Sequence, residues 1–167
     1  ENPGVRLCGV DAWSAYPGYR DHVDQDKLNR FYEEAQTRVQ PYPRTTLLRE
    51  FSLDAARRFK DGSLDFVYLD ANHSFQHVVA DLAAWGPKVR PGGIIAGHDY
   101  SRYRAPNQIH VVQAINGWTD AWAIAPWFLL GSRAKVAGQR RDDARSWFWV
   151  QPEPAQIPRQ TRRPLKQ

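Results

Sequence analysis

The chain has 167 residues, of which 42% are hydrophobic and 25% are charged. This size is typical of one globular domain, and no apolar stretch approaches the roughly 18 residues that a membrane-spanning helix needs. The single cysteine, Cys8, excludes an intrachain disulfide and a zinc site built from thiolates. The first residues have no secretory leader pattern, so we expect a cytoplasmic protein and no membrane association.

The net charge of +5 is concentrated at one end of the chain. Residues 140–167 contain seven Arg or Lys and three Asp or Glu, a balance of +4, which leaves +1 for the rest. A nucleic-acid groove on the folded part is therefore not expected. Residues 1–150 are predicted to form the folded domain, and the basic, Pro-rich residues 151–167 a disordered tail. The chain starts at Glu1 and contains no methionine, which suggests a fragment or a processed chain.

Apolar runs and turn residues predict alternating strands and helices. Strands are expected at residues 5–10, 45–49, 65–70, 94–97, 127–130 and 146–150. Helices are expected at residues 24–39, after a Ser52 N-cap, after a Ser74 N-cap, and at residues 109–118. Pro91-Gly92-Gly93 predicts a tight turn before the fourth strand.

The alternation predicts an α/β domain with a Rossmann-like, mostly parallel sheet and helices on both faces. Three of its strands are followed by acids, namely Asp11, Asp70 and Asp99. The carboxyl ends of parallel strands share one edge of a sheet, where ligands bind. We therefore expect these carboxylates to converge there.

A divalent cation is one ligand that this edge could hold. Asp70, His98 and Asp99 offer two carboxylates and an imidazole, which suit Mg²⁺, Mn²⁺ or Ca²⁺, and also admit Zn²⁺ or Fe²⁺. The alternative is that both acids cap neighbouring helices. His73 follows Asp70 by three residues, and a neutral imidazole there could act as a general base. His77 is interpreted as an exposed helix residue.

The first strand carries a second set of candidates. Asp11 could accept hydrogen bonds from the hydroxyls of a ribose, or it could cap its own loop. Trp13 could stack on a ligand or serve as packing material. Ser52 could touch an adenine or cap its helix. Cys8 lies in mid-strand and is interpreted as a small buried apolar residue.

DFVYLDANHSFQHVVADLAAWGPKVRPGGIIAGHDY, at residues 65–100, resembles the fourth strand, following helix and fifth strand of class I S-adenosylmethionine-dependent methyltransferases. The closest group is the small-molecule and sugar O-methyltransferases, including the macrolide-sugar enzymes. GVDAW at residues 9–13 is similar to their second strand, and REFSLDAARRF at residues 49–59 to the stretch that passes the adenine.

The resemblance implies a role for each matched residue. Asp11 would bind the cofactor ribose, and Asp70 is a further expected cofactor-binding residue. Asp70 and Asp99 would also bind a divalent cation such as Mg²⁺, and His73 would be the general base. His98 matches a position that is usually acidic, so it removes one negative charge from the metal site. The implied substrate is a hydroxyl group of a small molecule or sugar, with S-adenosylmethionine as cofactor.

One family feature has no counterpart in these residues. The first strand and its glycine-rich loop, which hold the methionine part of the cofactor, should precede Val5, and a strand with its crossover helix takes roughly 30 residues. We therefore expect weak cofactor binding by this chain alone, or an oligomer or second chain that completes the sheet. Two alternatives stay open, a non-catalytic interaction module and a nucleotide-binding dehydrogenase.

Overall fold

The computed structural model describes residues 4–16, 24–101, 109–131, 137–138 and 144–153. Contacts divide the chain into two compact units, residues 1–59 and 60–167, and each is described by itself. The predicted tail lies outside the described residues from position 154 onward. None of the helices in the described segments is long and apolar enough to cross a membrane.

The first unit is a parallel strand pair with two helices. It contains β1 (Leu7–Asp11), α1 (Gln25–Val39), β2 (Thr45–Arg49) and α2 (Ser52–Ala56). β1 and β2 pair in parallel, with Asp11 opposite Arg49 at their carboxyl ends. The Asp24 side chain caps α1 by accepting a hydrogen bond from the Lys27 amide.

Two expectations for this unit are corrected. Ser52 is the first residue of α2 rather than its N-cap, because Phe51 takes that position without a side-chain cap. Cys8 is exposed rather than buried, since its strand pairs with β2 alone among the described residues. The partial desolvation that remains raises the pKa of the Cys8 thiol, which disfavours a thiolate nucleophile.

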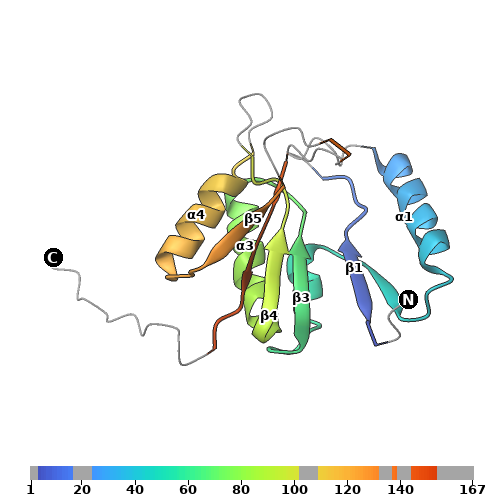
Figure 1. Ribbon diagram of the computed structural model, residues 1–167. Coiled ribbons are helices and arrows are strands. Elements are labelled where there is room, and N and C mark those ends of the chain that lie inside the picture. The colour runs from blue at the N-terminus through green and yellow to red at the C-terminus, as the bar shows by residue number, and fades with distance from the viewer. Residues whose placement is uncertain (1–3, 17–23, 102–108, 132–136, 139–143, 154–167) are drawn as a thin grey trace, which may run out of the picture. The chain divides into compact units, whose positions relative to one another are not determined.

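The second unit is a four-stranded sheet with helices, in the strand order β3-β4-β6-β5 (Figure 1). Its elements are β3 (Leu64–Leu69), α3 (Phe75–Trp85), the 3₁₀ turn η1 (Gly86–Lys88), β4 (Val89–Gly97), α4 (Val111–Ala121), β5 (Trp127–Leu130) and β6 (Ser146–Val150). β3 and β4 are parallel, whereas β6 runs antiparallel to both β4 and β5. The mixed α/β class with parallel strands is confirmed.

β4 is longer than expected because the predicted Pro91-Gly92-Gly93 turn lies within it. Leu64 pairs with Val89 and Phe66 with Ile94, so the extra residues of β4 form a bulge between these pairs. Gly92 adopts a positive φ of 73°, which glycine tolerates, and its amide bonds the carbonyl of Gln151. The bulge leaves the carboxyl half of β4 in register with β3.

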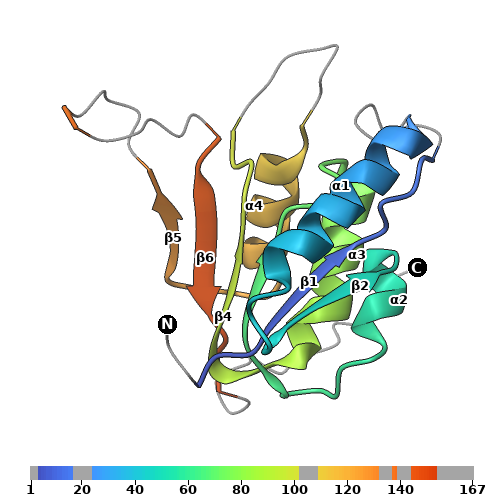
Figure 2. The same cartoon turned by 90° about the vertical axis from the view of Figure 1, so that its right-hand side faces the viewer.

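The core of the second unit lies on one face of its sheet. Residues on this face include Val67, Ile95, Trp147 and Trp149, and all are buried. The helices α3 and α4 pack against each other (Figure 2). The alternate positions of the strands carry exposed apolar side chains, namely Phe66, Tyr68, Phe128, Leu130 and Val150.

Candidate functional site

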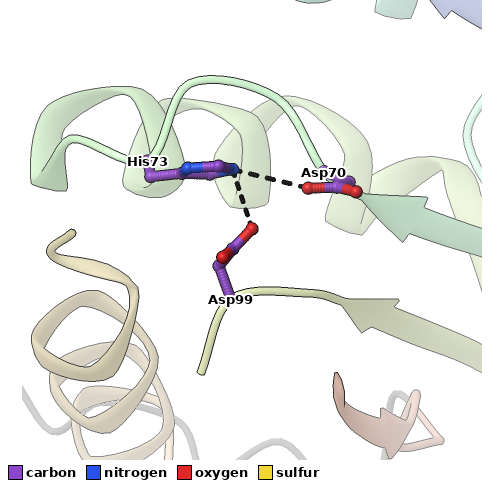
Figure 3. A group of neighbouring side chains, drawn as sticks. All are labelled: Asp70, His73 and Asp99. Carbon is purple, nitrogen blue, oxygen red and sulfur yellow. Dashed lines mark hydrogen bonds and ion pairs between the residues drawn. The ribbon is translucent and has the colours of Figure 1, made fainter. Parts of the chain in front are cut away.

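Three side chains gather where the parallel strands β3 and β4 end (Figure 3). Asp70 follows the last residue of β3, and Asp99 comes two residues after the end of β4. His73 lies in the short segment between β3 and α3. Because Leu69 is in register with Gly97, the two strands deliver their following acids to the same edge.

The imidazole of His73 contacts both carboxylates through one atom. Its Nε2 lies 3.4 Å from Oδ1 of Asp70 and 3.1 Å from Oδ2 of Asp99. The Asp99 side chain is 15% exposed, that of His73 25%, and that of Asp70 49%. The cluster therefore has a shielded carboxylate on one side and a solvent-facing one on the other.

Asp99 adopts an uncommon backbone conformation. Its φ is 57°, in the left-handed region, which aspartate tolerates better than most residues. The amide of Ser101 donates a 2.7 Å hydrogen bond to its carbonyl. Such conformations persist where the surroundings fix them, and they often occur at functional sites.

Hydrogen bonds to backbone carbonyls hold the segments on both sides of the cluster. The His98 amide donates to the Leu69 carbonyl at 3.1 Å, which extends the β3–β4 ladder by one residue. The indole Nε1 of Trp147 donates to the His98 carbonyl at 3.0 Å. The His110 amide, just before α4, donates to the carbonyl of His73 at 2.9 Å. These bonds hold the segments that carry Asp99 and His73 in place beside the ends of β3, β4 and α4.

The surroundings of Asp70 favour its ionised form. The hydrogen bond with His73 lowers the pKa of Asp70, an effect stronger than the opposing one of desolvation, and the charges of His98 and His73 add to it. A hydrogen on Nε2 of His73 can be donated to either acid. The two carboxylates would thus stabilise an imidazolium at this position, as a carboxylate does in hydrolytic triads.

The same three residues suit a divalent cation. One ligand atom from each of Asp70, His73 and Asp99 lies within 4.8 Å of the others. Carboxylate oxygens with an imidazole nitrogen match the preferences of Mg²⁺, Mn²⁺ or a transition metal. The donor set therefore fits a cation, with Nε2 of His73 as either a ligand or a proton carrier.

The structure brings together three of the predicted residues, Asp70, His73 and Asp99. His98 is not part of this group and contacts its Asp99. Nδ1 of His98 lies 3.3 Å from Oδ2 of Asp99, and His98 lines a small, partly open pocket of about 20 Å³ together with Trp147. His77 is exposed and its Nδ1 lies 2.6 Å from Oγ of Ser74, in agreement with its interpretation as a surface residue.

The candidates of the first unit are placed at and after the end of β1. Oδ1 of Asp11 accepts a 2.6 Å hydrogen bond from the Trp13 amide, which is the loop-capping contact. The Trp13 ring lies 4.9 Å from that of Tyr32, so it also has a packing role. Sequence reasoning missed Gln25 and Arg49, whose side chains bond the Trp13 carbonyl from α1 and β2. No local motif marks either residue.

Comparison with known proteins identifies related sequences and folds. The profile of a family described as "Methyltransferase domain" matches residues 1–100. The uncharacterized protein y4gI of Sinorhizobium fredii is 32% identical over 69 residues, which span 41% of this chain and 8% of that protein. The chain thus corresponds to a small part of that curated relative.

Solved structures share the fold at low sequence identity. An O-methyltransferase from Bacillus cereus, in complex with SAH, has a TM-score of 0.54 and 18% identity, with 87% of this chain and 73% of that chain covered. The N-methyltransferase NodS from Bradyrhizobium japonicum has a TM-score of 0.54 and 15% identity, and the match covers 89% of this chain and 74% of that chain. Because one relative methylates oxygen and the other nitrogen by name, the shared fold leaves the acceptor atom open.

Proposed function

The chain belongs to the methyltransferase domain family, and from this premise we propose that it takes part in S-adenosylmethionine-dependent O-methylation of a small molecule or sugar. The observation that carries the choice of oxygen is the His73 imidazole between the carboxylates of Asp70 and Asp99. An alcohol is a weak nucleophile until it loses its proton, so O-methylation benefits from such a base.

In the proposed reaction His73 removes the proton of the acceptor hydroxyl. S-adenosylmethionine would supply the methyl group when bound: the oxygen would form a bond to the sulfonium methyl carbon as the carbon–sulfur bond breaks, with S-adenosylhomocysteine as the leaving group. The charge that forms on the imidazole is stabilised by Asp70 and Asp99, which lie 3.4 and 3.1 Å from its Nε2. Proximity of the two substrates would supply much of the remaining rate enhancement.

We assign the divalent-cation role to Asp70 and Asp99, with His98 next to Asp99. A bound cation would lower the pKa of a coordinated hydroxyl and orient it. Nε2 of His73 cannot be a metal ligand and a proton carrier at the same time. In this proposal it carries the proton, and the carboxylates hold the cation.

For cofactor binding we propose Asp11 as the acceptor of the ribose hydroxyls, with Trp13 and Ser52 beside the nucleoside. Asp11 lies at the carboxyl end of a parallel strand, which is the position from which such acids act. Its existing bond to the Trp13 amide leaves further lone pairs on the carboxylate.

The direct test measures formation of S-adenosylhomocysteine by the complete gene product with a panel of hydroxylated small molecules and sugars. His73→Ala should lower the rate by about 10²- to 10⁴-fold, the usual contribution of a general base. His77→Ala is the matched control, because His77 is an exposed histidine of α3, four residues after His73, and it should leave the rate unchanged. Equal rates for the wild type and His73→Ala would refute the assignment of the base.

A second candidate is an interaction module that pairs with another copy of itself. The exposed apolar side chains Phe66, Phe128, Leu130 and Val150 favour this candidate, because large apolar patches often mark interfaces. Sedimentation of the wild type and of Phe128→Ser/Leu130→Ser discriminates the two. Self-association that the substitutions abolish, in a protein without cofactor binding, would favour the module. A monomer that binds cofactor would exclude it.

A further inference from the structure

Arg49 and Gln25 hold the loop that follows Asp11. We propose that they are positioning residues, which fix the backbone of Trp13 so that the Asp11 carboxylate is presented to the hydroxyls of the cofactor ribose. This inference rests on the proposed function, and it assigns to both residues a role that acts through the backbone of the loop.

The loop contains a residue in an uncommon backbone conformation. Trp13 has a φ of 40°, in the left-handed region that bulky residues avoid. The bend turns its amide back onto Oδ1 of Asp11 at 2.6 Å. A strained residue persists where its surroundings fix it, and strain of this kind concentrates at functional sites.

Four hydrogen bonds connect the loop to α1 and β2 in a closed ring. Nε2 of Gln25 donates to the Trp13 carbonyl at 3.0 Å and to Oδ1 of Asn29 at 2.9 Å. Nη2 of Arg49 donates to the same two acceptors, at 2.9 Å for the Trp13 carbonyl. Each nitrogen carries two hydrogens, so both hydrogens of each donor are used.

Gln25 adds a contact on the far side of Trp13. Its Oε1 accepts a 2.9 Å hydrogen bond from the Ala15 amide, while its Nε2 faces the two acceptors. One side-chain amide therefore fixes the loop at two successive points. Exchange of the amide for a carboxylate would keep the acceptor toward Ala15 and lose the donor toward Trp13.

An aromatic ring fixes the guanidinium from a second direction. Arg49 lies 4.9 Å from the centroid of the Tyr32 ring, which the Trp13 ring also approaches to 4.9 Å. Such a stacked, planar cation that donates two bonds from one nitrogen is not reproduced by lysine. Arg49 is opposite Asp11 in the β1–β2 register, so its contacts with Trp13 connect the carboxyl ends of both strands.

The exposure of the Gln25 and Arg49 side chains indicates that this network contributes little to the stability of the core. Gln25 and Arg49 are both exposed, and the core residue of α1 is Leu28. Three of their polar contacts are thus directed at a short segment beside a proposed ligand-binding acid, two at the Trp13 carbonyl and one with the Ala15 amide. A role in shaping that segment accounts for them better than a role in global stability, because exposed polar contacts contribute little to it.

The test uses S-adenosylhomocysteine and its 2′-deoxy analogue, titrated into the complete gene product by calorimetry. The wild type should prefer the natural ligand. Arg49→Ala and Gln25→Glu should weaken that ligand by about tenfold, the value of one hydrogen bond to a charged group, and bind the analogue nearly as the wild type does. Arg49→Lys should rescue only part of the loss. Arg38→Ala, an exposed arginine of α1 paired with Glu34, is the control.

Each other outcome has a distinct meaning. If the variants lose both ligands equally, or lose neither, the positioning role is refuted while cofactor binding stands. If the wild type does not distinguish the two ligands, the ribose role of Asp11 and this inference both fail. If the wild type binds neither ligand, the proposed function itself fails. Near-ultraviolet circular dichroism of each variant verifies its fold, and Gln25→Ala replaces any variant that does not fold.

Discussion

The Nε2 atom of His73 lies 3.1 Å from Oδ2 of Asp99, although the two residues come from separate elements on either side of α3. The second carboxylate of the cluster, that of Asp70, shares the same nitrogen at 3.4 Å. Strand register creates this contact, since β3 and β4 run in parallel and end together. The cluster is therefore a product of the sheet rather than of a local motif.

Cation binding should depend on Asp99 more than on acids of the unit that lie outside the cluster. Asp99→Asn removes a shielded carboxylate from the group of potential ligands, so its affinity for Mn²⁺ should fall by about tenfold to a hundredfold, as calorimetric titration measures. Asp65→Asn is the matched control, because Asp65 is exposed and paired with Arg90 outside the cluster. Unchanged Mn²⁺ affinity of Asp99→Asn would contradict the assignment.

The same Mn²⁺ titration distinguishes a proton-carrying role of His73 from a role as a metal ligand. If His73 carries a proton rather than the metal, His73→Ala should bind Mn²⁺ about as the wild type does and still lose methyl transfer. A large loss of Mn²⁺ affinity in His73→Ala would instead make Nε2 a ligand, which the donor set also permits. The two measurements together decide between the roles.

Ionised Asp70 should stabilise the fold in a defined pH range. The His73 hydrogen bond lowers the pKa of Asp70 below its ordinary value, so the stabilisation is present above the usual carboxyl range and is lost as the pH falls through the lowered pKa. The stability difference between the wild type and Asp70→Asn should thus shrink on acidification. Because Asp70 is half exposed, the difference should be about 1 kcal/mol or less.

The measurement is the urea midpoint of both proteins across a pH series without divalent cations. Glu50→Gln serves for comparison, because the Arg58 hydrogen bond lowers the pKa of the Glu50 carboxyl, which lies outside the cluster. A wild-type advantage over Asp70→Asn that grows toward low pH would have the wrong sign and would refute the account of this pair.

Two glycines of the second unit should respond to alanine in opposite directions. A Cβ on Gly97 would overlap the Trp147 indole and approach the Leu69 carbonyl to 2.5 Å, so Gly97→Ala should destabilise by about 1–3 kcal/mol and disturb the cluster. A Cβ on Gly117, inside α4, would meet no atom within 4 Å, so Gly117→Ala should stabilise by about 0.5–1 kcal/mol. Denaturant unfolding of both variants measures the contrast, and destabilisation by both would contradict it.

Much of the fold could be predicted from the sequence because its signals are local. The strand at residues 45–49 and the aromatic strands at residues 127–130 and 146–150 have the predicted bounds, and the other described strands and helices differ mainly at their ends. The bulge in β4 could not be predicted, since Pro91-Gly92-Gly93 is typical of a turn and its place within a strand depends on pairing with β3.

The site was predictable in part for the same reason. Acids after strands indicate a shared edge, so the sequence predicts Asp70 and Asp99, and their convergence follows from parallel pairing. Contacts between elements distant in the chain leave no such pattern. Arg49 reaches the Trp13 carbonyl across 36 positions of sequence, and neither residue type signals the bond.

The central claim is that this methyltransferase-family protein binds S-adenosylmethionine, and calorimetric titration of that cofactor into the complete gene product tests it most directly. The account predicts saturable binding that Asp11→Ala weakens by at least about tenfold. Absence of saturable binding by the wild type at millimolar cofactor would contradict the account.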